Sequence, residues 1–120
     1  GGDGITIRVS TLDHYVEEKN IQKIDLVKID VEGFEQRVIA GSVNTLQRFK
    51  PKLFIEINND NLKEQGNSAR ALIQQLLNFG YQIKRADTNE KIAADFDFDN
   101  CHFDVIAVHE QDPILLLWPS

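Results

Sequence analysis

The stretch from Leu26 to Glu35, LVKIDVEGFE, constrains the fold of this chain more than any other segment. An apolar run ends at Asp30, and Glu32, Gly33 and Glu35 follow it. In open α/β sheets, ligands bind beyond the carboxyl ends of parallel strands, so a strand that ends at Asp30 and turns at Gly33 into a helix places carboxylates where such proteins carry out chemistry. The same residues can also have a purely structural role. Asp30 can be a helix N-cap, and Glu32 and Glu35 can favour the positive end of the following helix.

The remaining sequence predicts strands that alternate with helices. Residues 24–30 form a nearly continuous apolar strand, which is typical of a parallel strand covered on both faces. We predict further strands over residues 5–9, 53–57, 81–85 and 103–109. The helices are expected to begin at Ser10 or Thr11, near Phe34 and at Asn67 or Ser68, and to end near Gly41 and at Gly80, with a short segment over residues 43–49 before Pro51. By the right-handed crossover rule, the earlier strands should be parallel.

Composition limits the class of protein. A chain of 120 residues holds one compact domain, 42% of its residues are hydrophobic, and no stretch resembles a membrane span or a signal peptide. The net charge of -6 argues against nucleic acid as a partner, because binding would require clustered Lys and Arg. A single cysteine, Cys101, excludes an internal disulfide and is compatible with a cytoplasmic location.

Several motifs, in order and spacing, resemble the FkbM family of S-adenosylmethionine-dependent methyltransferases across roughly residues 5 to 85. They are TLDHYV at 11–16, IDLVKIDVEGFE at 24–35, VIAG at 38–41 with Leu46, PKLFIEI at 51–57 and Gly80-Tyr81. The resemblance implies an α/β fold: a partial Rossmann-like methyltransferase sheet, mostly parallel, with a C-terminal antiparallel hairpin and helices on both faces. It also implies S-adenosylmethionine as cofactor and a hydroxyl of a small molecule or sugar as methyl acceptor.

The glycine-rich turn that holds the cofactor in this family lies upstream of the segment seen here. Such a turn needs a hydrophobic strand before it and a helix after it. Gly1-Gly2-Asp3-Gly4 has neither and is interpreted as a turn or a cloning remnant. We therefore expect residues 1–120 to be one domain that corresponds to the C-terminal part of a methyltransferase domain, to lack the cofactor-binding half and to be inactive in isolation. The cofactor-binding residues stay unknown.

Three carboxylates are the candidate catalytic residues. Asp30 ends one strand and Glu56 lies near the end of the next, so the two should be about 5 Å apart laterally. Carboxylates this close perturb one another, and one can serve as a general base. We assign Asp30 first, as a base or as the partner of the acceptor hydroxyl, with Glu32 and Glu56 in support. Mg²⁺ could bridge such oxygens, but no recognised ligand spacing is present, so no metal site is assigned.

Other constellations have structural interpretations. Residues 95–100, DFDFDN, imitate half of a calcium loop but lack its glycine and glutamate, and are interpreted as an alternating edge segment with Phe inward and Asp outward. Cys101 and His102 with His109 lack zinc spacing, which makes Cys101 a small core residue. His14 is expected on the surface. The apolar tail, residues 113–119, is expected to cover exposed core or a neighbouring chain.

Two hypotheses of different class remain. The chain is the C-terminal part of a methyltransferase that acts on a small-molecule or sugar hydroxyl, or it is a catalytically silent half-domain or interaction module in the form given. The strand over residues 24–30 would pair on one side with a strand of the missing half, so its free edge or the apolar tail predicts a homo-oligomer.

Overall fold

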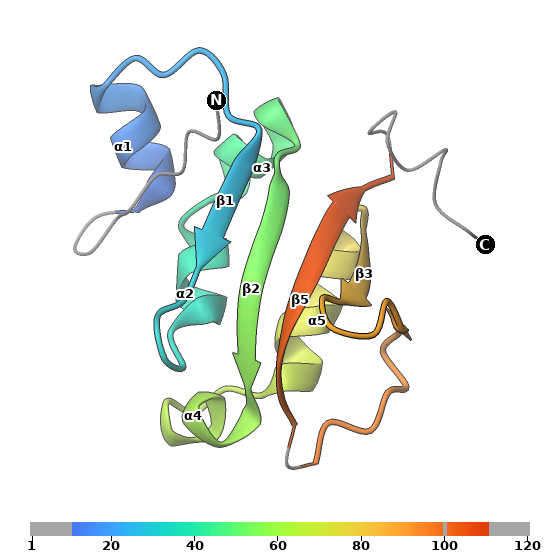
Figure 1. Cartoon of the computed structure of the whole chain (residues 1–120). Coiled ribbons are helices and arrows are strands. Elements are labelled where there is room, and N and C mark those ends of the chain that lie inside the picture. Colours follow the sequence, from blue (N-terminus) through green and yellow to red (C-terminus); the bar gives the residue numbers. More distant parts are fainter. Residues whose placement is uncertain (1–10, 100, 111–120) are drawn as a thin grey trace.

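The computed structural model describes residues 11–99 and 101–110, which form one mixed sheet with helices (Figure 1). The elements, in chain order, are α1 (Leu12–Glu18), β1 (Leu26–Ile29), α2 (Glu35–Ala40), α3 (Val43–Phe49), β2 (Lys52–Asn58), α4 (Asn59–Glu64), α5 (Ala69–Asn78), β3 (Tyr81–Arg85), β4 (Lys91–Ile92) and β5 (His102–His109). The strand order is β1-β2-β5-β3-β4.

The sheet departs from the mostly parallel arrangement predicted from the sequence. β1 pairs with β2 in parallel, as expected, but β5 pairs antiparallel with both β2 and β3, and β3 pairs antiparallel with β4. The prediction of a mostly parallel sheet is therefore wrong for the described pairings. β1, β2 and β3 do run in one direction. The reversed strand β5, which inserts between β2 and β3, removes the parallel contact that β2 and β3 would otherwise make.

Helices cover one face of this sheet. α2, α3 and α5 lie behind the strands in Figure 1, and no described helix crosses the face toward the viewer. The strands alternate accordingly: Leu53, Ile55 and Ile57 of β2 are fully buried, whereas Phe54 and Glu56 are only partly covered. We call the side that carries Phe54 and Glu56 the open face. Helices were predicted on both faces of the sheet, but within residues 11–99 and 101–110 they cover one face. Leu26 of β1 is accordingly 37% exposed.

Local signals in the sequence place several helix ends correctly. The Thr11 hydroxyl accepts a hydrogen bond from the His14 N–H at 3.1 Å, and the Ser68 hydroxyl accepts one from the Ala71 N–H at 3.1 Å. These are the N-caps of α1 and α5. After α5, Gly80 has φ +90°, a left-handed conformation that glycine adopts without steric cost. The chain therefore leaves α5 directly into β3.

Two elements were not predicted, and the assignment of one segment is confirmed only in part. Helix α4 follows β2 at once, with the Asn58 side chain accepting a hydrogen bond from the Asn61 N–H at 3.1 Å. The short strand β4 pairs with β3. Residues 95–99 form a loop and not a sheet edge, but the predicted alternation is confirmed, because Phe96 and Phe98 pack against each other and the core while the aspartates are exposed.

The predicted strand over residues 5–9 and the apolar tail over residues 113–119 lie outside the described residues. Within the described ranges, no helix is both long and apolar enough to cross a bilayer.

Candidate active site

The turn between β1 and α2 is held by a buried carboxylate. Glu35 is only 2% exposed, and its two oxygens accept hydrogen bonds from the backbone N–H groups of Val31 (3.0 Å) and Gly33 (2.9 Å). The N-cap of α2 is Phe34, which makes no side-chain cap bond. Asp30 is therefore not the helix cap considered above. Glu35, the first residue of α2, fixes the turn from inside.

Gly33 brings this turn against the helix that follows β2. Its φ of +103° is left-handed, and a Cβ added there would lie 2.4 Å from the backbone oxygen of Asn61 in α4. Only glycine fits, because both the conformation and the space exclude a side chain. The carboxyl ends of β1 and β2 are thus joined through the contact between the turn and α4.

The carboxylates of Asp30 and Glu32 stand free on this turn. Both residues are exposed, and neither side chain has a hydrogen bond or ion pair with another described residue. Glu32 has φ +50°, an uncommon conformation for a residue with a side chain. Glu35 occupies the N–H groups of Val31 and Gly33, and the side-chain groups that this turn offers to a ligand are these two carboxylates.

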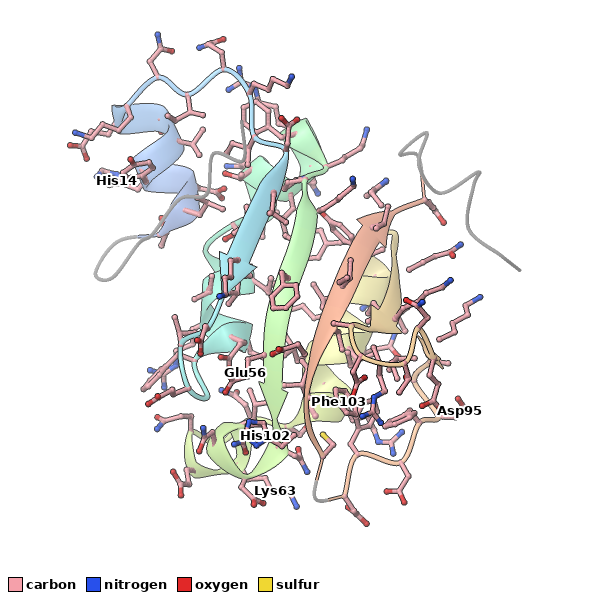
Figure 2. The ribbon with its side chains drawn as sticks, in the orientation of Figure 1. His14, Glu56, Lys63, Asp95, His102 and Phe103 are labelled. Atoms are coloured by element: carbon pink, nitrogen blue, oxygen red, sulfur yellow. The ribbon has the colours of Figure 1, made fainter. Side chains whose placement is uncertain are left out.

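Glu56 lies on the neighbouring strand, on the open face (Figure 2). The register pairs Ile29, the last residue of β1, with Ile55, and Asp30 and Glu56 are the residues that follow this pair. Neighbouring strands are about 5 Å apart, so Asp30 leaves β1 near the part of β2 that carries Glu56. On its other side Glu56 is paired with Asp104 of β5. Glu32 lies further along the turn. Two of the three predicted carboxylates thus follow paired residues of neighbouring strands, and Asp104 is a third carboxylate at this end of the sheet.

Sequence reasoning missed His102 and Asp104 as members of this edge. The His102 Nε2 atom lies 3.6 Å from Glu56 Oε1, with the two side chains 65% and 31% exposed. The antiparallel direction of β5 brings its first residue to the carboxyl end of β2, with Asn58 opposite His102. An alternating pattern shows that residues 103–109 form a strand but not which strand they pair with, so the sequence held no signal for this contact.

The other candidates have structural roles. Burial raises the pKa of the Cys101 thiol above its ordinary value, and Cys101 lies in the core cluster, which fits a packed residue and not a nucleophile. His14 is exposed, as expected. Within residues 11–99 and 101–110, no three His, Cys, Asp or Glu side chains are grouped to hold a metal ion.

A groove of about 480 Å³ lies between α1 and α3, lined in part by Asp13, Asn44 and Thr45. It is at the amino ends of β1 and β2, because α1 and α3 precede those strands. The Asp13 carboxylate accepts hydrogen bonds from the N–H groups of Asn44 (3.0 Å) and Thr45 (2.8 Å) at the start of α3. Asp13 therefore ties α1 to α3, away from the carboxyl ends of β1 and β2. We call that end of the sheet, with Asp30, Glu32 and Glu56, the acidic edge.

Comparison with known proteins identifies relatives. The model of the methyltransferase FkbM domain matches residues 1–83. The 2-O-methyltransferase NoeI of Sinorhizobium fredii (strain NBRC 101917 / NGR234) is 32% identical over 75 residues, which cover 62% of this chain and 30% of that protein. The chain thus spans less than a third of the length of this curated relative. No solved structure matches significantly.

Proposed function

The chain belongs to the methyltransferase FkbM domain family, and on that premise we propose that it forms part of an enzyme that methylates a hydroxyl oxygen, with S-adenosylmethionine as the methyl donor. The acceptor is a small molecule or a sugar. The 2-O-methyltransferase name of the relative supports transfer to oxygen.

The free carboxylate of Asp30 is the observation that carries the assignment of the site. It follows the last residue of β1, at the carboxyl edge where α/β proteins bind ligands, on a turn that Glu35 and Gly33 hold rigid. A positioned, unpaired carboxylate can accept a hydrogen bond from an acceptor hydroxyl. In methyl transfer, the protein mainly aligns donor and acceptor and removes the acceptor proton. Asp30 orients the hydroxyl, with Glu32 and Glu56 in support.

The described residues fit part of the cofactor. Asp30 and Glu32 are unpaired acceptors suited to hydroxyl or ammonium groups, such as those of S-adenosylmethionine or a sugar. When bound, the cofactor supplies an activated methyl group. The backbone N–H groups of Val31 and Gly33 are taken by Glu35, so we do not assign this turn as a glycine-rich cradle for the cofactor. We propose that other parts of the enzyme complete the donor site.

The strand directions support a Rossmann-like sheet as the fold of the whole domain. β1, β2 and β3 share one direction, and a long helical connection separates each pair. We propose that upstream chain adds parallel strands beyond β1 and helices over the part of the open face that lies away from His102. A cytoplasmic location fits the single cysteine.

The alternative proposal is that the chain as given is catalytically silent, a half-domain or interaction module that keeps the acceptor-side carboxylates. It is favoured by the 30% share of the relative that the chain spans. Calorimetric titration distinguishes the two, because a silent half-domain binds S-adenosylmethionine weakly or not at all. A micromolar or tighter dissociation constant would exclude this alternative.

The function is tested with methyl-labelled S-adenosylmethionine and a panel of hexose methyl glycosides, incubated with the complete gene product. We expect label on a hydroxyl oxygen of one or more glycosides, located by mass spectrometry and NMR. A correctly folded complete protein that binds the donor but labels no hydroxyl of the panel or of cellular small-molecule extract would contradict the proposal.

A further inference from the structure

We propose that His102 is the general base that takes the proton from the acceptor hydroxyl, with Glu56 as the residue that positions it. This inference rests on the proposed function and adds a catalytic residue that lies outside the matched range of the family model, residues 1–83.

The position of His102 follows from the reversed direction of β5. His102 is the first residue of β5, so it lies at the edge where β1 and β2 end, on the same face as Glu56 (Figure 2). Ile29, the last residue of β1, pairs with Ile55 of β2, and Asp30 and Glu56 are the residues that follow this pair. The imidazole therefore stands on the open face, with β2 between it and the end of β1, and lies about 10 Å from Asp30 across the sheet.

Glu56 lies beside one of the two imidazole nitrogens. Its Oε1 atom is 3.6 Å from His102 Nε2, and in the proposed step Nε2 keeps its hydrogen while Nδ1 is the proton acceptor. The distance is that of an ion pair and longer than a hydrogen bond. Protonation of the ring would draw the two groups together, because the pair then becomes charged. The Glu56 side chain is 31% exposed, which shields the pair in part from solvent.

Charged side chains of β2, β5 and α4 lie at the same end of the sheet as His102. On β5, Asp104 lies two residues further along the same face and opposite Glu56. Helix α4 begins directly after β2 and carries Asp60 in its first turn and Lys63 in its last (Figure 2). Histidine is the side chain that most readily takes up and releases a proton near neutral pH.

The proposed step balances as follows. The hydroxyl proton moves to Nδ1 of His102, and the oxygen keeps the electron pair of the broken O–H bond. That pair forms the new bond to the donated methyl carbon, while the carbon–sulfur bond of the donor breaks with its electrons going to sulfur. The imidazolium then releases its proton to water, which the 65% exposure of His102 allows. Asp30, on the other side of β2, contacts another hydroxyl of the acceptor and so orients the molecule.

His14 offers a matched control. Its Nε2 lies 3.1 Å from Glu18 Oε2 on α1, and its side chain is 64% exposed, so it is an equally accessible histidine paired with a glutamate away from the acidic edge. We compare His102→Ala and His14→Ala in the complete gene product, with labelled S-adenosylmethionine and the hexose methyl glycoside that the wild type labels best. His102→Ala should lower kcat about 10²-fold, with little change in KM for the donor, and added imidazole should restore part of the loss. His14→Ala should leave kcat unchanged.

Two further measurements separate a base from a structural residue. Glu56→Gln should lower kcat less than His102→Ala and alter the pH profile, since it removes the group that orients the ring. Addition of the glycoside without donor should shift the NMR signals of the His102 imidazole and leave those of His14 in place. Wild-type kcat in His102→Ala would overturn the inference but not the proposed methyltransferase function. The same holds if kcat falls, imidazole does not restore it and the glycoside does not shift the His102 signals. Absence of methyl transfer by the wild type would overturn both.

Discussion

The carboxylate of Glu35 accepts a hydrogen bond from the backbone N–H of Gly33 at 2.9 Å, from a position that is 2% exposed to solvent. Its second oxygen binds the N–H of Val31 at 3.0 Å. One side chain thus satisfies two backbone donors of the turn that carries Asp30 and Glu32. The orientation of the candidate catalytic carboxylates therefore depends on Glu35. From the sequence alone, Glu35 was interpreted only as a negative charge near the start of a helix.

Replacement of Glu35 by Gln should destabilise the fold. The amide keeps the size of the side chain, but it has one acceptor oxygen and turns an N–H donor toward a backbone donor. Leaving one buried N–H group unsatisfied costs about 1–3 kcal/mol in the free energy of unfolding. Urea titration measures this loss. Glu64→Gln, at an exposed position of α4, is the control. Equal midpoints for the two variants would mean that Glu35 does not hold the turn.

Two of the left-handed glycines, Gly33 and Gly66, provide a second comparison. Alanine at Gly66, where φ is +76° and no atom lies within 4 Å of the added Cβ, meets only backbone strain. We expect a cost of about 1 kcal/mol. Alanine at Gly33 adds an overlap at 2.4 Å with the Asn61 backbone oxygen, so the expected cost is about 2–4 kcal/mol. Thermal unfolding that ranks Gly66→Ala as the more destabilised variant would contradict the contact between the turn and α4.

Cys101 should react slowly with alkylating reagents in the folded protein. Burial raises the pKa of its thiol above the ordinary 9.0, so less thiolate exists at a given pH than in the unfolded chain. By linkage, the contribution of the neutral thiol to stability is complete below the ordinary pKa and is lost as pH rises through the higher folded-state pKa. Iodoacetamide labelling at pH 8, native against denatured, checks the rate. Equal rates would indicate an accessible thiol.

β1 occupies one end of the order of the described strands, and we propose that in the isolated 120-residue chain this edge, or the apolar tail, supports a homo-oligomer. Lys28 is the one charged residue of β1, which leaves the edge poorly protected against pairing. Light scattering at high micromolar concentration should give a mass above one chain. If the edge is the contact, Leu26→Lys should lower that mass, whereas Phe34→Lys, at a side chain that is likewise 37% exposed, should not. A monomeric wild type would refute this proposal.

Local signals in the sequence predicted much of the fold. The strand over residues 81–85 was predicted at its observed bounds, and the strand over residues 53–57 lies within β2. Thr11, Ser68 and Gly80 marked helix ends because caps depend on the residue itself and its near neighbours. The parallel pairing of β1 with β2 followed from the crossover rule.

The missing parts depend on contacts between distant residues. Periodicity does not reveal strand direction, so the insertion of β5 between β2 and β3 could not be predicted, nor could the approach of His102 to Glu56. Helix α4 begins within the Asn/Asp run of residues 58–61, directly after a strand. Such residues are equally typical of a turn, so the sequence did not predict the helix. The role of Glu35 requires knowledge that its side chain is buried.

The central claim, that the acidic edge after β1 binds the methyl acceptor, is tested most directly by the turnover of Asp30→Asn in the complete gene product. The substitution keeps the size of the side chain and removes its charge, and Asp30 makes no side-chain contact among the described residues, so folding should be retained. We predict that methyl incorporation falls about 10²-fold, with a smaller loss for Glu56→Gln. Wild-type turnover in a correctly folded Asp30→Asn enzyme would contradict the claim.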